Sequence, residues 1–306
     1  MTVYHYARGG FELESDWPLP SLTPRTDAQA APRGRVRIRR GDAPDEIAGA
    51  ARIDALTQVA PDQMLFVHPT HGRFWVRNGE EIVAAPAAAD GTLGDLRPFL
   101  LGSGFAALAI QNGDLLLHAS AAAVDGRAVA FAGVSGAGKS TLLGAFIAAG
   151  HAPVADDLCF VESNAGALAK VWPAPGRLRL WPDSVAALGL GETAADREIA
   201  AVEKLELALD TTAVQGPLPL AAVFILKESE AKAPLIEPIA GPTAITELAQ
   251  QLFRPYYAHA MGGLPALLPR LAHAVDGGVR ILRLRSPRRY DALPEIRRAI
   301  RAALDA

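Results

Sequence analysis

The sequence predicts an α/β protein in two parts, with a small β-rich N-terminal domain over residues 1–90 and a larger α/β domain over residues 91–306. Three observations lead to this prediction. Short alternating segments separated by turn residues fill the first part, and a glycine-rich loop between an apolar strand and an apolar helix marks the second. Small, flexible residues at 86–91 separate the two, and a chain of 306 residues is long enough for two cores.

Composition and charge restrict the compartment and the partners. The net charge of −3 gives no general attraction to nucleic acid or to an anionic membrane. Cys159 is the single cysteine, which excludes an internal disulfide and fits a reducing compartment. The first ten residues show no secretory signal, and the longest apolar segment, 99–110, is too short to cross a bilayer. We therefore expect a cytoplasmic protein that binds neither nucleic acid nor membrane.

One predicted strand of the N-terminal part carries a row of positive charges. Arg35, Arg37 and Arg39 alternate with Val36 and Ile38, so the arginines share one face and the apolar residues the other. We interpret the basic face as the solvated side of the strand. Docking of an acidic peptide on this face is the alternative interpretation.

Turn residues and apolar runs predict the remaining elements. Asn-Gly and Asp-Gly dipeptides accept the positive φ angles of two-residue turns, so we expect one hairpin at Asn78-Gly79 and a second, antiparallel one at Asp125-Gly126. The second hairpin would join apolar runs at 115–124 and 127–132. We further expect strands at 152–161, 221–226 and 279–284, and helices at 92–111, 139–149, 242–253 and 294–304.

The glycine-rich loop, residues 133–140, matches the nucleotide phosphate-binding pattern Gly-x4-Gly-Lys-Ser in full. Its glycines let successive backbone N–H groups point at an anion, and the helix N-terminus adds partial positive charge. We expect Lys139 to reach the β- and γ-phosphates of ATP, and the Ser140 hydroxyl to coordinate Mg²⁺. The residues predicted to contact the nucleotide are Gly133, Ser135, Gly136, Ala137, Gly138, Lys139, Ser140 and Thr141.

An acidic pair, Asp156 and Asp157, follows Lys139 by 17 and 18 residues. One helix and a short loop return the chain beside the phosphate-binding strand within that spacing, so the pair is expected near the terminal phosphate. Phosphoryl transfer needs a metal ligand and a proton acceptor. We assign proton acceptance to Asp156 and metal binding to Asp157 with Ser140, and the reverse assignment is the alternative. Both carboxylates can serve the site only if the strand ends or bends there.

His118 lies 21 residues before Lys139, on the strand predicted to pair with the one that enters the loop. That register allows its imidazole to lie beside the acidic pair and adjust a carboxylate's pKa. A buried, hydrogen-bonded core histidine is the alternative interpretation. The predicted catalytic residues are therefore Asp156, His118 and Lys139. A transporter ATPase is disfavoured, because we find neither its Leu-Ser-Gly-Gly signature nor a later apolar strand ending in Asp-Glu.

These motifs together resemble the C-terminal kinase domain of the bacterial HPr kinase/phosphorylases. The residues that carry the resemblance are His118, Lys139, Ser140, Asp156 and Asp157. An antiparallel hairpin that leads into the phosphate loop is a feature of that family and of the related ATP-dependent phosphoenolpyruvate carboxykinases. The resemblance implies a P-loop kinase core of this type, and HPr kinases form hexamers, so a homo-oligomer is an option.

A longer resemblance is to the HPr-kinase-related serine kinases of lasso-peptide biosynthesis clusters. The segments that carry it are Tyr4 with 13–20, and residues 100–103, 117–120 and 178–182. It implies an ATP-dependent kinase for a serine hydroxyl of a peptide or protein, in the lasso case at the C-terminus of the precursor peptide.

The chain also departs from the HPr kinases. Where they have Glu-Ile-Arg it has Pro175-Gly176-Arg177, and we find no counterpart of their phosphorolysis loop, which argues against phosphorylase activity. Arg177, Arg179 and Lys204 are candidates for binding phosphate or an acidic acceptor, with surface charge as the alternative. Two other functions fit the motifs, namely a kinase for a metabolite hydroxyl and a non-catalytic ATP-binding regulatory protein.

Overall fold

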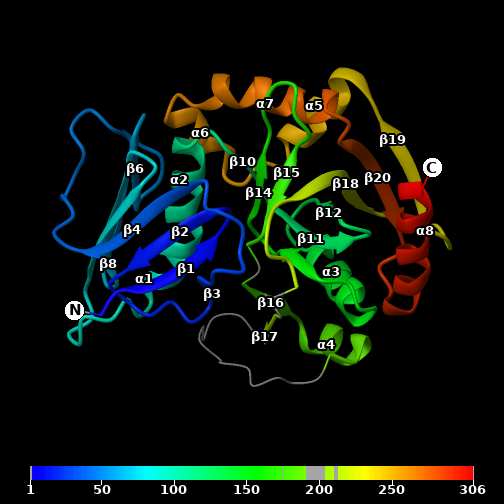
Figure 1. The fold of residues 1–306 in the computed structure, drawn as a ribbon, viewed down its shortest axis with the longest axis horizontal. Helices are drawn as coiled ribbons and strands as arrows, with labels where there is room; N and C mark the ends of the chain where they lie inside the picture. Colours follow the sequence, from blue (N-terminus) through cyan, green and yellow to red (C-terminus); the bar gives the residue numbers. More distant parts are fainter. Residues whose placement is uncertain (1, 175, 191–203, 210–212, 306) are drawn as a thin grey trace. The chain divides into compact units, whose positions relative to one another are not determined.

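The computed structural model describes residues 2–174, 176–190, 204–209 and 213–305, and has a mixed α/β architecture with several sheets (Figure 1). The chain divides into two compact units. The first combines Met1–Leu116 with Leu252–Arg270, and the second combines Leu117–Gln251 with Leu271–Ala306. This division falls after residue 116 rather than after residue 90, and the predicted boundary between independent domains stays a prediction.

The first unit is built on a sheet in the order β3-β1-β2-β4-β9-β8-β7-β6-β5. The β2–β4 and β4–β9 pairs are parallel, and the other pairs are antiparallel. The strands are β1 (Tyr4–Arg8), β2 (Phe11–Ser15), β3 (Thr23–Pro24), β4 (Gly34–Arg40), β5 (Ala51–Arg52), β6 (Thr57–Ala60), β7 (Gln63–His68), β8 (Gly72–Arg77) and β9 (Glu81–Pro86).

Strand β4 has the two faces that its alternating sequence predicts. Val36 and Ile38 are buried in the core, while Arg35 and Arg37 are exposed. Both arginines form ion pairs with Glu14 of the neighbouring strand β2, at 3.4 and 3.5 Å. Carboxylates of the same sheet thus balance the basic face, which favours the interpretation of a solvated strand face over a docking site for an acidic peptide.

The predicted hairpin at Asn78-Gly79 is confirmed, with φ angles of 54° and 70° at the turn between β8 and β9. The predicted helix at 92–111 begins later, as α1 (Leu96–Phe99), continues as a π-helical segment (Leu100–Gly104) and ends as α2 (Phe105–Gln111). The late start has a local cause, because Gly91 and Gly94 have φ angles of 68° and 44°, which a right-handed helix does not contain. Helix α6 (Pro255–Ala260) completes this unit, and helix α7 (Leu264–Asp276) crosses the division between the units.

The sheet of the second unit contains the order β14-β15-β18-β12-β11-β13, with β20 beside β18 and β19 beside β20. Strands β12, β18 and β20 are parallel neighbours, and β11 pairs antiparallel with β12 through the confirmed turn at Asp125-Gly126. The strands of this sheet include β11 (Ala119–Val124), β12 (Arg127–Ala132), β13 (Pro153–Ala155), β14 (Cys159–Glu162), β15 (Lys170–Trp172), β18 (Leu218–Glu228), β19 (Leu235–Ile239) and β20 (Arg280–Ser286). Strands β16 (Arg177–Leu180) and β17 (Leu205–Ala208) form a separate pair.

Two segments predicted as single strands are interrupted. The run 115–124 divides at His118 into β10 (Leu115–Leu117) and β11, because the His118 backbone N–H donates to the carbonyl of Gln251 at 2.8 Å. The run 152–161 divides at Asp156-Asp157 into β13 and β14, and Asp157 has a φ of 67°. Both breaks fall on predicted site residues.

Helices cover the second sheet and complete its core (Figure 1). Helix α3 (Lys139–Ala148) follows the phosphate loop as predicted, and its Phe146 packs on Phe131 of β12 with ring centroids 5.1 Å apart. Helix α8 (Leu293–Asp305) buries Ile296 and Ile300 in the same core. Helices α4 (Pro182–Leu188) and α5 (Gly241–Ala249) are shorter, and α5 ends four residues before its predicted end. In the parts of the chain described, no helix is long and apolar enough to cross a membrane.

Candidate active site

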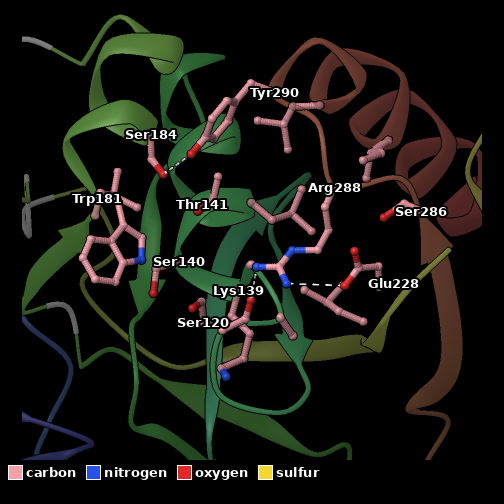
Figure 2. Close-up of a pocket in the computed structure, with 18 of the residues that line it drawn as sticks. Ser120, Lys139, Ser140, Thr141, Trp181, Ser184, Glu228, Ser286, Arg288 and Tyr290 are labelled. Carbon is pink, nitrogen blue, oxygen red and sulfur yellow. Dashed lines mark hydrogen bonds and ion pairs between the residues drawn. The ribbon is translucent and has the colours of Figure 1, made fainter. Parts of the chain in front are cut away.

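A pocket of about 470 Å³ in the second unit contains the predicted phosphate loop (Figure 2). The N-terminus of α3 and the loop form its floor. Segments 179–184, 226–228 and 286–290 form further walls, and His118, Ser120 and Asp157 also line it. Because β12, β18 and β20 are parallel, their carboxyl ends meet at the same edge of the sheet, where such folds bind ligands.

The phosphate loop has a backbone that only glycine adopts without strain. Gly133, Gly136 and Gly138 have φ angles of 145°, 80° and 96°. A Cβ atom on Gly133 would also lie 3.1 Å from the carbonyl oxygen of Leu226 on the adjacent strand. The glycine spacing of the motif is therefore required by this loop geometry, and backbones with such φ angles are the kind that can direct N–H groups at an anion.

The Lys139 side chain folds back on the loop. Its ammonium donates hydrogen bonds to the carbonyls of Gly133 at 2.9 Å and Val134 at 3.1 Å. Burial lowers the pKa of Lys139, and the charges of Asp157 and Asp156 oppose that effect. The predicted phosphate-binding cation thus lies inside the loop beside the acidic pair.

Asp156 is joined to the loop by hydroxyl groups. Its Oδ1 accepts hydrogen bonds from Ser140 at 2.9 Å and from Ser120 at 2.6 Å. Burial raises the pKa of Asp156, and the negative charge of Asp157 adds to this, while the two hydroxyl donors oppose it. Ser120 was not predicted as a site residue; it lies two residues after His118 and directly before Ala121, which pairs with Ala155 of β13.

Asp157 points to a different partner. Its Oδ1 lies 3.2 Å from His118 Nε2, and its side chain is 62% exposed. Partial desolvation by the pocket walls raises the pKa of Asp157, but the hydrogen bond and charge of His118, with the charges of Arg179 and Lys139, outweigh this effect and leave the pKa lowered. The break at Asp156-Asp157 thus gives both carboxylates a place at the site, as the sequence analysis required, with different environments.

The three basic residues predicted near the site, Arg177, Arg179 and Lys204, have different partners. Arg177 and Arg179 both pair with Glu206 of β17, at 3.5 and 2.7 Å. The Lys204 ammonium lies 5.3 Å from the ring centroid of Trp181, in a cation–π contact. The pocket lining includes Arg179, Lys204 and Trp181, and among the described residues it does not include Arg177. Their predicted role in binding phosphate or acceptor stays a prediction, and Pro175 lies outside the described residues.

Further lining residues that the sequence motifs did not indicate come from distant segments, among them Glu228, Arg288, Ser184 and Tyr290. Arg288 Nη2 donates to the carbonyl of Gly136 at 2.7 Å, and its Nη1 lies 3.4 Å from Glu228 (Figure 2). The hydroxyl groups of Tyr290 and Ser184 lie 2.9 Å apart. For Arg288, the sequence signal was a pair of arginines shortly after the strand predicted at 279–284. This signal points to the site only when that strand is known to pair with β18.

The residues present fit a magnesium ion held mainly by phosphate and water. No group of three or more His, Cys, Asp or Glu side chains suited to a metal occurs among the described residues. Mg²⁺ needs fewer protein ligands than that, since it keeps several waters and binds one or two protein oxygens beside the phosphates. The Ser140 hydroxyl and the Asp156 carboxylate offer such oxygens, whereas Asp157, the predicted metal ligand, contacts His118.

Comparisons with known proteins add little. No protein-family model matches the chain, and no curated protein matches it. Among solved structures, the Hpr(Ser) kinase/phosphatase from Coxiella burnetii matches with 14% sequence identity and a TM-score of 0.34, over 62% of this chain and 99% of that chain. Values this low assign neither a family nor an activity to the protein.

Proposed function

We propose that this protein is an ATP-dependent kinase that transfers the γ-phosphate to a serine hydroxyl of a peptide or protein. The observation that carries the proposal is the arrangement of two carboxylates around the phosphate loop: Asp157 lines the same pocket as Lys139 and Ser140, and Asp156 is hydrogen-bonded to Ser140. A site that only binds nucleotide needs the loop and its lysine. A carboxylate supported by His118 is an addition that phosphoryl transfer uses.

In this proposal the loop amides, the N-terminus of α3 and Lys139 hold the phosphates of ATP. Ser140 and Asp156 would hold the metal, since the Asp156 carboxylate accepts hydrogen bonds from the hydroxyls of Ser140 and Ser120 and so lies beside Ser140. The Mg²⁺ ion would supply positive charge against the phosphate oxygens. Asp156 replaces Asp157 as the metal-side residue, which is the alternative assignment left open by the sequence.

Asp157 then accepts the proton of the acceptor. Its carboxylate lines the pocket and is largely exposed, and its lowered pKa keeps it ionised near neutral pH. The hydroxyl proton passes to Asp157 as the acceptor oxygen bonds to the γ-phosphorus. The bond from that phosphorus to the β–γ bridging oxygen breaks, and ADP leaves with the electron pair. His118 positions and stabilises the carboxylate.

For the acceptor, we propose a peptide in the cytoplasm, and as its most specific form the C-terminal serine of a lasso precursor peptide. The sequence resemblance to the lasso-cluster kinases supports this choice. In the pocket, Trp181 is 48% exposed and lies beside Lys204, so an aromatic and a cationic surface are available to a peptide segment. Neither nucleic acid nor membrane takes part, and the active form can be a homo-oligomer.

The test is mass spectrometry of peptides ending in serine after incubation with the protein, ATP and Mg²⁺. We expect a gain of one phosphate on serine. Asp157→Asn should slow transfer about 10²- to 10⁴-fold with ATP affinity little changed, the range for loss of a general base. Asp125→Asn is a matched control, because Asp125 is also an aspartate with positive φ, at 49°, but does not line the pocket.

Transfer by Asp157→Asn at the wild-type rate would contradict the mechanism. Phosphate found only on small metabolites would favour the metabolite kinase. ATP binding without any transfer would favour the regulatory protein.

A further inference from the structure

The loop between β20 and α8 brings an arginine to the phosphate loop. In the parallel trio β12, β18 and β20, the phosphate loop follows β12, Glu228 is the last residue of β18, and Arg288 comes two residues after β20. Glu228 pairs in register with Ser286, which places the following loop directly over the end of β18. Residues 152 positions apart in the sequence therefore meet at the edge of the sheet where the phosphates are expected.

Arg288 makes two contacts there (Figure 2). Its Nη2 donates to the carbonyl oxygen of Gly136 at 2.7 Å, and its Nη1 lies 3.4 Å from a carboxylate oxygen of Glu228. The Arg288 side chain is 56% exposed. A guanidinium has five N–H donors in a planar fork, so these two contacts hold the group in place and leave donors for another ligand.

A nucleoside triphosphate needs more positive charge than Lys139 supplies. The Lys139 ammonium is already hydrogen-bonded to two loop carbonyls, so part of its donor capacity is used within the loop. Arginine matches phosphate oxygens through its fork and keeps its charge at every physiological pH. In related phosphoryl-transfer sites an arginine of the same chain supplies this charge at the terminal phosphates.

We propose that Arg288 is a phosphate-binding residue, which donates to an oxygen of the β- or γ-phosphate while Glu228 holds its guanidinium at the tip of the loop. The inference rests on the proposed binding of ATP. It differs from a purely structural role, in which Arg288 would only fasten the β20–α8 loop to the phosphate loop. Loss of a purely structural residue would weaken the binding of all nucleotides to the same extent. Loss of a contact to the terminal phosphates would weaken the binding of ATP more than that of AMP, which has a single phosphate.

The experiment is calorimetric titration of the wild-type protein, Arg288→Gln and Arg285→Ala with ATP, ADP and AMP in the presence of Mg²⁺. Arg285 is a matched control, since it lies on the same β20, is 47% exposed and pairs with Glu237 at 3.3 Å, but does not line the pocket. We expect Arg288→Gln to weaken ATP binding about 10- to 100-fold, as for loss of a charged hydrogen bond, and AMP binding less than about 2-fold. Arg285→Ala should bind all three nucleotides like the wild type.

Two results would overturn the inference while leaving the proposed function intact. One is an equal loss of affinity for AMP and ATP, which indicates a fastening role. The other is wild-type affinity of Arg288→Gln for ATP. Failure of the wild-type protein itself to bind ATP would instead refute the proposed function, so the two failures are distinguishable. Circular dichroism of each variant checks that its fold is unchanged.

Discussion

Removing Arg33 should destabilise the first unit by several kcal/mol, because it would take a bidentate cationic partner away from the buried Asp114 carboxylate. Both guanidinium Nη atoms of Arg33 bond to the two oxygens of Asp114, with Nη2–Oδ2 at 2.7 Å. The side chains are only 17% and 4% exposed. Arg33 also donates to the carbonyl of Gly9 and lies 4.2 Å above the ring of Phe11. Bidentate geometry and burial distinguish this pair from the exposed pairs of β4.

The expected magnitude follows from these contacts. Breaking a buried pair by removal of one partner costs about 3–5 kcal/mol, while replacing both partners by apolar residues is close to neutral. With about 2–4 °C for each kcal/mol in parts of this size, Arg33→Met should lower the melting temperature by about 6–20 °C. The double variant Arg33→Met/Asp114→Leu should recover most of that loss.

The assay is thermal unfolding followed by circular dichroism, combined with hydrogen exchange of peptides from each unit. Exchange should increase in β4 of the first unit and stay unchanged in β12 of the second, which locates the effect. Exposed pairs are worth only about 0–1 kcal/mol, so Arg35→Met serves as a control with little effect. An unchanged melting temperature of Arg33→Met, or a double variant as unstable as the sum of the single variants, would refute the reasoning.

Three further predictions concern the second unit. His118 favours the ionised form of Asp157, so His118→Ala should raise the pKa of that carboxyl. The acid limb of the pH profile of kcat/KM should then move to higher pH. An acid limb that does not move would exclude Asp157 as the base. Cys159 is fully buried with its pKa raised to about 12, so the native protein should resist a thiol reagent that labels the unfolded chain, and rapid labelling of the native protein would contradict its burial. Gly138→Ala should lower the free energy of unfolding by about 1–2 kcal/mol, because Gly138 has a φ of 96°, and it should weaken ATP binding. Denaturant unfolding and nucleotide titration measure the two effects. A variant equal to the wild type in both would show that the loop adapts to alanine.

The hairpins, the phosphate loop and helix α3 could be predicted because neighbouring residues determine them. Positive φ at Asn78 and Gly79 follows from the two residues themselves, and so does the turn at Asp125-Gly126. The start of the helix predicted at 92 was misplaced, because Gly91 and Gly94 have positive φ angles and the periodicity of apolar residues does not report the backbone conformation of a glycine.

The breaks in two predicted strands had no local signal. The apolar run through His118 reads as continuous, yet the backbone there bonds to Gln251, a residue more than a hundred positions away. The strand through Asp156 likewise ends where its carboxylate meets Ser120 and Ser140. Hydrogen bonds of this kind satisfy buried polar groups only after the chain has folded, so no pattern of nearby residues contains them.

The sequence alone determined the glycine-rich loop and the helix that follows it, because the glycine spacing is a constraint of residue type, while the chemistry expected of its lysine and of the paired aspartates stays a prediction. The tertiary structure decided which aspartate faces which partner, since a single positive φ at Asp157 turns one carboxylate toward His118 and leaves the other with Ser140. It also brought Arg288 to Gly136 across 152 positions of sequence. Only the parallel packing of β12, β18 and β20 makes those residues neighbours, and such packing depends on the whole sheet rather than on any one segment.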